Sequence, residues 1–136
     1  MPNSDKTTVL IVDDEEDVLR PIAFRLEAQG FSVLLEPDGE LGFQTAVAKR
    51  PDLILLDVMM PGMDGLALCA ILKEREDTGA IPIIILTAKT AVADVEKVFR
   101  SGADDYVAKP FEWDELHEKI NRCLAHSAMP QATSQG

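Results

Sequence analysis

The sequence predicts a single α/β domain, in which helices cover both faces of a parallel β-sheet. Short apolar runs alternate five times with segments of helical periodicity, and this alternation produces parallel strands joined by right-handed crossovers. The two strongest runs, LILL and IPIIIL, are apolar on both faces, as in strands buried inside a parallel sheet. A chain of 136 residues suffices for one such domain and is too short for two separate cores.

Each expected element can be assigned to a segment of the chain. The expected strands, in order, are Val9–Val12, Phe31–Leu35, Leu53–Leu56, Ile81–Leu86 and the weaker Tyr106–Ala108. Between and after them, apolar side chains recur every three or four residues, which is typical of amphipathic helices. The expected helices contain Leu19–Leu26, residues 39–49, Leu68–Leu72, Val92–Phe99 and Trp113–Leu124.

Two glycines and one proline bear on where these helices begin and end. Gly30 and Gly102 stand where helices would need a carboxyl-terminal cap, a position that favours glycine. Pro21 falls about one turn inside the first helix. Because proline has no amide hydrogen, we expect it to bend this helix or to delay its start.

Charge and apolar patterning exclude several classes of protein. The formal net charge is −11, so phosphate backbones repel the chain and we expect no direct binding of nucleic acid. No apolar run approaches the roughly 20 residues of a membrane helix, and the polar segment Met1–Thr8 does not read as a signal peptide. Cys69 and Cys123 form no metal-binding spacing. We therefore expect a cytoplasmic domain with reduced thiols and no membrane contact.

Charged and polar residues follow the expected strands at their carboxyl ends, where ligands bind in open parallel α/β sheets. They are Asp13 and Asp14 after the first strand, Asp57 after the third, Thr87 after the fourth and Lys109 after the fifth. Two carboxylates about 4 Å apart repel by roughly 4 kcal/mol at an effective dielectric constant of 20. A divalent cation relieves this repulsion, and a site of oxygen ligands suits Mg²⁺. The pattern indicates that a phosphoryl group is handled at Asp57 with a metal alongside.

Five sequence elements in order resemble the receiver domain of two-component response regulators, in a form similar to chemotaxis regulators. They are the pair Asp13-Asp14, Asp57 within LILLDVMMPGMDG, Thr87 within ILTA, Tyr106 within GADDYVAKPF, and Lys109-Pro110. The resemblance extends from about Thr8 to Ala125. It implies a doubly wound, flavodoxin-like (βα)5 fold with strand order 2-1-3-4-5. The expected organisation is an extension at residues 1–7, the receiver at 8–126, and a disordered tail or linker at 127–136.

The resemblance also implies a role for each matching residue. Asp57 would accept a phosphoryl group from the phosphohistidine of a sensor histidine kinase or a histidine phosphotransfer protein. Asp14, Asp57 and the backbone carbonyl of Met59 would bind Mg²⁺ directly, and Asp13 would act through a water molecule. The chain would be no enzyme beyond promoting its own phosphorylation and dephosphorylation.

Other matching residues would contact the phosphoryl group or transmit its presence. Lys109 would contact the phosphoryl oxygens, and the Lys109–Pro110 peptide bond would be cis. The Thr87 hydroxyl would bind the phosphoryl group, and Tyr106 would change rotamer to fill the vacated space. The surface formed by the fourth helix, fifth strand and fifth helix would then switch. A phosphorylation-dependent homodimer is compatible with this, and the downstream target or attached output domain is unknown.

Four alternatives are weighed against the receiver. A flavodoxin-type flavin binder needs a phosphate-binding loop after the first strand, where this chain has five consecutive acids. A P-loop nucleotide hydrolase is excluded because the sequence contains no G-x-x-x-x-G-K motif. A haloacid-dehalogenase-type phosphatase has its nucleophile after the first strand, whereas the candidate here, Asp57, follows the third. A pseudo-receiver, which is an interaction module without phosphorylation, would lack one of the charged site residues, and none is missing. The sequence leaves open whether the chain is a receiver fragment of a larger multidomain regulator.

Overall fold

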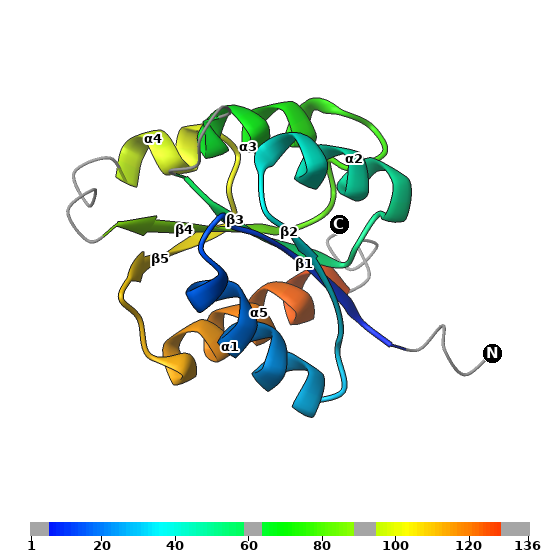
Figure 1. The fold of residues 1–136 in the computed structure, drawn as a ribbon. Helices are drawn as coiled ribbons and strands as arrows, with labels where there is room; N and C mark the ends of the chain where they lie inside the picture. Colours follow the sequence, from blue (N-terminus) through cyan, green and yellow to red (C-terminus); the bar gives the residue numbers. More distant parts are fainter. Residues whose placement is uncertain (1–5, 59–63, 89–94, 129–136) are drawn as a thin grey trace.

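The computed structural model describes residues 6–58, 64–88 and 95–128. Within these residues, strands and helices alternate five times along the chain (Figure 1). The strands are β1 (Thr8–Val12), β2 (Ser32–Glu36), β3 (Leu53–Asp57), β4 (Ile83–Ala88) and β5 (Asp105–Lys109). The helices are α1 (Glu16–Ala28), α2 (Gly39–Lys49), α3 (Gly65–Glu74), α4 (Val95–Arg100) and α5 (Trp113–Ala128).

The strands form one parallel sheet between two layers of helices. Their order is β2-β1-β3-β4-β5, and every neighbouring pair is parallel. Helices α1 and α5 cover one face, and α2, α3 and α4 cover the other (Figure 1). The predicted doubly wound fold and strand order are therefore confirmed.

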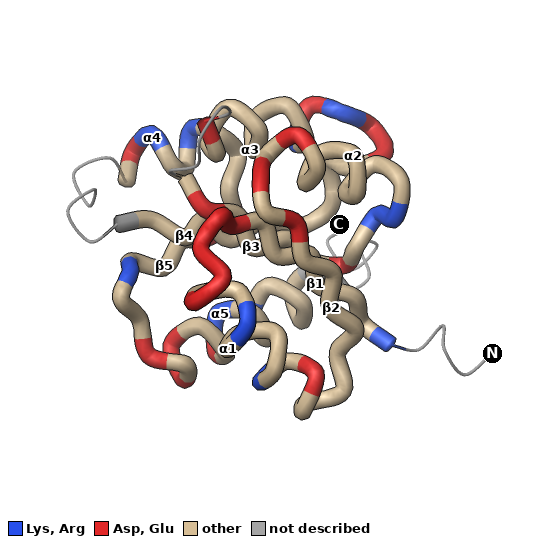
Figure 2. Tube along the Cα trace, viewed as in Figure 1, with Lys and Arg blue, Asp and Glu red and all other residues tan. Residues whose placement is uncertain are grey.

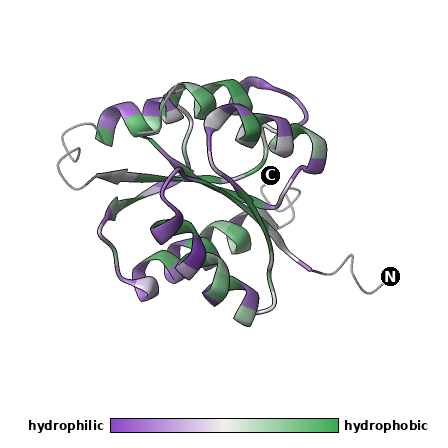
Figure 3. Cartoon of the chain, viewed as in Figure 1, coloured by the Kyte–Doolittle hydropathy of each residue, from purple (hydrophilic) through white to green (hydrophobic). Residues whose placement is uncertain are grey.

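Each face of the sheet carries its own hydrophobic core. Successive residues of a strand point to opposite faces, so Leu10 joins the core under α2 and α3 whereas Val9 and Ile11 join the core under α1 and α5. Every residue of β3 is buried. This explains why the central strands are apolar along most of their length, as the hydropathy colouring shows (Figure 3).

Aspartates and glycines fix several helix ends. The Asp38 and Asp64 carboxylates accept hydrogen bonds from backbone amides in the first turns of α2 and α3, at 2.8 and 3.0 Å, which caps those helices. Gly30 and Gly102 have φ angles of +98° and +94°. These left-handed conformations are typical of glycines that end helices, so both predicted caps are confirmed.

Some boundaries differ from those expected. The amide of Leu19 already donates to the Glu15 carbonyl at 3.0 Å, so α1 begins at Glu16 and the predicted delay by Pro21 is wrong. Pro21 is the sixth residue of α1, and the amides of Val18 and Leu19 already donate to the Glu15 carbonyl ahead of it, so the first turn forms without the missing amide of Pro21. Ile81 belongs to a turn, in which its amide donates to the Thr78 carbonyl; β4 therefore begins at Ile83, after Pro82.

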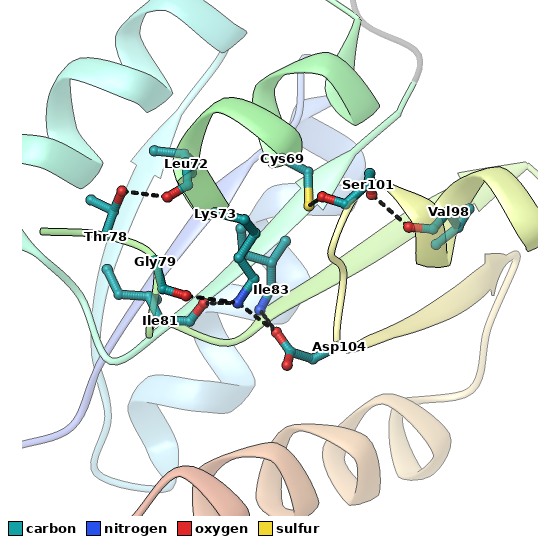
Figure 4. Close-up of polar contacts among 10 residues, drawn as sticks. All are labelled: Cys69, Leu72, Lys73, Thr78, Gly79, Ile81, Ile83, Val98, Ser101 and Asp104. Atoms are coloured by element: carbon teal, nitrogen blue, oxygen red, sulfur yellow. Dashed lines mark hydrogen bonds and ion pairs between the residues drawn. The ribbon is translucent and has the colours of Figure 1, made fainter. Parts of the chain in front are cut away.

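A half-buried lysine, Lys73, ties together three segments at the amino-terminal edge of the sheet (Figure 4). Lys73, near the end of α3, donates from Nζ to the Gly79 and Ile81 carbonyls at 3.3 and 2.7 Å. Its Nζ also lies 3.0 Å from Asp104 Oδ2, which accepts the Ile83 amide at 2.8 Å. These contacts, which we call the Lys73 cluster, hold α3 against the start of β4 and the α4–β5 turn.

The last helix extends further than the sequence suggested. Helix α5 reaches Ala128, two residues into the segment that was assigned to a tail. In the described part of the chain, no helix is both long enough and apolar enough to cross a membrane.

Candidate functional site

The carboxyl ends of β1 and β3 bring three carboxylates together. Asp13 and Asp14 directly follow β1 and Asp57 ends β3. Each offers an oxygen within 4.8 Å of the oxygens of the other two. Asp13 and Asp57 are buried, at 0% and 4% exposure, whereas Asp14 is exposed. The residues that the sequence predicted to lie together therefore do so.

Lys109, the last residue of β5, supplies a cation to this cluster. Its Nζ lies 2.9 Å from Asp13 Oδ2, 3.3 Å from Glu15 Oε1 and 3.5 Å from Asp57 Oδ1. Burial alone would lower the pKa of Lys109, but the hydrogen bond to Asp13 and the charges of Asp13 and Asp57 outweigh it and raise that pKa. Lys109 is therefore held as a cation beside Asp57.

The carboxylates of Asp13 and Asp14 differ in their hydrogen-bond partners and in their access to solvent. One oxygen of Asp13 accepts from Lys109 and the other accepts the Glu15 amide at 2.9 Å. Both oxygens of Asp13 thus have a protein donor, which fixes the orientation of this buried group. Asp14 is exposed and lines the open cavity above the site. Asp14 and Asp57 are thus the two carboxylates of the cluster that reach this cavity.

The site opens into a cavity of about 670 Å³ between α1 and the β5–α5 connection. Its acidic wall comes from the run that begins α1, which is visible as the red segment of the tube (Figure 2). Its apolar wall includes Pro21, Ile22 and Phe111. The Lys109–Pro110 peptide bond is cis, as expected. Among the described residues that line the cavity, Lys109 is the one cation and the other charged groups are negative, so Lys109 favours an anionic group beside it.

The donors of the cluster fit a small, hard cation. Carboxylate oxygens are the ligands that Mg²⁺ takes in proteins, usually with several waters that complete its octahedron. Three such groups within 4.8 Å repel one another, and the single charge of Lys109 offsets only part of this repulsion. The expected contribution of the Met59 carbonyl lies outside the described residues.

The two predicted switch residues lie on neighbouring strands. Thr87, near the end of β4, is only 3% exposed. It follows Leu86, which pairs with Asp57 in the sheet register. Tyr106 on β5 is half-buried, and the centres of its ring and the Phe99 ring of α4 lie 5.9 Å apart, with the two rings nearly perpendicular. Tyr106 therefore connects β5 with α4.

Two charged residues of this region were not assigned from the sequence. Glu15 contacts Lys109 across a separation of 94 residues, and no local pattern marks such a contact. Lys119 of α5 donates to the Tyr106 carbonyl at 2.7 Å and lies 5.2 Å from the centre of the Tyr106 ring. It also pairs with Asp105 at 3.5 Å. Lys119 thus links α5 to the strand that bears Tyr106.

Known proteins share both the sequence and this architecture. The pattern of the response regulator receiver domain matches residues 9–121. The transcriptional regulatory protein CseB of Streptomyces coelicolor is 40% identical over 121 residues, which are 89% of this chain and 50% of CseB. The chain thus spans about half the length of the curated relatives it matches.

Two solved receiver domains of histidine kinases are also similar. One, from Syntrophus aciditrophicus, has a TM-score of 0.84 and 33% identity, covering 93% of this chain and 96% of that one. The other, from Pseudomonas aeruginosa, was crystallised with a magnesium ion coordinated in its active-site cleft. It has a TM-score of 0.80 and 32% identity, and the match covers 88% of this chain and 98% of that one. With the family pattern spanning most of the chain, these findings show that the chain belongs to the response regulator receiver domain family.

Proposed function

We propose that this receiver accepts a phosphoryl group on Asp57 from a phosphohistidine of a histidine kinase or a histidine phosphotransfer protein. The observation that carries the proposal is the position of Asp57. Its carboxylate is almost buried, yet it lines an open cavity and lies 3.5 Å from the Lys109 ammonium. Such a carboxylate can meet a phosphoryl donor that enters from solvent.

The reaction would be a direct displacement at phosphorus. A carboxylate oxygen of Asp57 attacks the phosphorus atom, the bond from phosphorus to the histidine nitrogen breaks, and its electron pair stays on the imidazole. The product is an acyl phosphate. Lys109 supports this step because its positive charge lies where the phosphoryl oxygens would come to rest. Hydrolysis of the acyl phosphate returns Asp57 to its carboxylate, and we expect the domain to promote this step as well.

The cation proposed for this site is Mg²⁺. Asp14 and Asp57 would hold it, with Asp13 acting through water and Met59 through its backbone carbonyl. When bound, Mg²⁺ neutralises negative charge on the carboxylates and on the phosphoryl oxygens. The three clustered carboxylates support this assignment, as does the magnesium ion in the Pseudomonas aeruginosa relative.

The phosphorylated state would be transmitted through Thr87 and Tyr106. A hydroxyl that binds the new phosphoryl group would draw the end of β4 inward, and Tyr106 would follow because it lies on the neighbouring strand. Contacts of Tyr106 with Phe99 and Lys119 would carry the change to α4 and α5. This surface would then bind the downstream target, an output domain or a second receiver. The unpaired thiols of Cys69 and Cys123 are compatible with action in the cytoplasm.

Incorporation of phosphate from a small phosphodonor tests the proposal. In the presence of Mg²⁺ we expect the intact protein to gain one phosphoryl group, measured by mass spectrometry. Asp57→Asn should gain none, whereas the matched variant Asp17→Asn, which removes another acid of the same cavity, should gain as much as the wild type. A folded wild-type protein that gains none, from either a small donor or a phosphohistidine, would instead identify a pseudo-receiver.

A further inference from the structure

An exposed aromatic side chain on α1 lies beside an apolar groove. Phe24 is 75% exposed, more than any of the chain's other exposed large apolar residues in the described part of the molecule. The groove, of about 330 Å³, lies between α1 and the edge strand β2. It is lined by Arg20, Ala23, Phe24, Glu27, Val33 and Leu35. Leu35 is itself 39% exposed, so apolar surface of both elements remains in water.

The charges at the two ends of this groove are opposite in sign. Arg20 and Glu27 are both exposed and stand seven residues apart on α1, with Ala23 and Phe24 between them. On a helix, residues separated by three, four and seven positions share one face. Along the helix, this face therefore carries a cation at one end, a small residue beside a large aromatic one in the middle, and an anion at the other end.

Such a face is complementary to itself when two copies meet in antiparallel orientation. A twofold axis between positions 23 and 24 places Arg20 of one copy opposite Glu27 of the other, and the reverse pair is formed at the same time. Within one chain Arg20 pairs with Glu16 at 3.4 Å, an exposed contact that leaves other donors of its guanidinium group for Glu27 of the second copy. The same axis sets each Phe24 over Ala23 and the groove of its partner. Ala23 is small and only 8% exposed, so its side chain does not project into the path of the incoming ring.

We propose that two copies of this chain associate through this α1–β2 face, with Phe24 of each inserted into the groove of the other. The proposal does not depend on phosphoryl transfer, and the face differs from the α4–β5–α5 surface. One helix and one edge strand bury a small area compared with most specific interfaces. We therefore expect half of the chains to be dimeric at a total protein concentration of roughly 10–100 μM.

Sedimentation equilibrium of the unphosphorylated full chain at fixed ionic strength tests this. Phe24→Ser should weaken association by roughly tenfold or more, because it removes the aromatic anchor. The matched variant Ile71→Ser removes a partly exposed apolar side chain of α3 and should leave association unchanged. Circular dichroism establishes that each variant is folded.

Charge reversal separates a contact between copies from an effect within one helix. Arg20→Glu and Glu27→Arg each place like charges opposite one another, so each variant alone should associate more weakly than the wild type. Mixed in equal amounts, the two variants should form a heterodimer at about the wild-type affinity, because both cross-pairs are again opposite in sign. A wild-type chain that stays monomeric at up to roughly 1 mM, or a mixture that stays monomeric, would overturn the proposal.

Discussion

Gly65 offers the sharpest perturbation of the phosphoacceptor that leaves every charged group of the site in place. It is the first residue of α3, and its amide donates to the Val58 carbonyl at 3.0 Å. A β-carbon at this position would lie 2.2 Å from the Asp57 carbonyl oxygen and 2.7 Å from the Val58 α-carbon. The start of α3 therefore packs directly on the backbone that carries Asp57.

The size of the effect follows from these contacts. Ordinary carbon–oxygen contacts are about 3.3–3.6 Å, so in Gly65→Ala the two backbone segments must separate by roughly 1 Å. A displacement of this size at a reacting group costs on the order of 10²-fold in rate. Overpacking also costs about 1–3 kcal/mol of stability. We expect a receiver that remains folded but is phosphorylated on the order of a hundred times more slowly.

Gly79→Ala is the matched control. A β-carbon there would lie 2.7 Å from the Arg75 carbonyl oxygen and 2.9 Å from that of Lys73, a comparable clash far from Asp57. The assays are the initial rate of phosphorylation by a small phosphodonor at saturating Mg²⁺, and urea unfolding followed by Trp113 fluorescence. Both variants should be less stable to urea than the wild type, and only Gly65→Ala should be phosphorylated more slowly. Equal rates for the two variants would refute the positioning role of Gly65.

Three further predictions concern the switch, the Lys73 cluster and the half-buried thiol of Cys123. Thr87→Ala should still be phosphorylated on Asp57, but amide shifts across α4 and β5 should be smaller than in the wild type; full-size shifts would make Thr87 an ordinary strand residue. Lys73→Met should lower the free energy of unfolding, measured with urea, by about 2–3 kcal/mol. Asp104→Asn should lower it by about 1 kcal/mol or less, because the Asp104 carboxylate is 41% exposed. A larger loss in Asp104→Asn than in Lys73→Met would contradict this prediction. Burial and nearby carboxylates raise the pKa of Cys123 from 9.0 to about 11, so between these values the unfolded thiol ionises first and stability falls as pH rises. Alkylation of native Cys123 should therefore show a midpoint near pH 11, and a midpoint near 9.0 would count against its burial.

The sequence predicted the parts of the fold that depend on local pattern. Strand β3 was recognisable because it is buried on both faces and so contains only apolar residues before Asp57. The position of Asp57 and Lys109 at one edge followed from the parallel topology, since all the strands end there. Gly30 and Gly102 marked helix ends because their left-handed conformation favours glycine.

Contacts between distant segments could not be predicted in this way. Lys73 has no motif around it, and its importance arises from a turn and a second loop that fold around its ammonium group. The link from Lys119 to Tyr106 likewise depends on how α5 packs on β5. Pro21 was expected to bend α1 or to delay its start, and the delay is wrong because the Val18 and Leu19 amides form the first turn with the Glu15 carbonyl ahead of it. For Lys73 and Lys119, packing between distant segments decided the contact.

The location of the phosphoryl group tests the central claim most directly. The receiver is incubated with a phosphohistidine donor, with Mg²⁺ or with a chelator, and its peptides are mapped by mass spectrometry. We predict one modified peptide, containing Asp57, whose phosphoryl group hydroxylamine removes, and no modification in the presence of chelator. A phosphoryl group on another residue, or full modification of Asp57→Asn, would contradict the account.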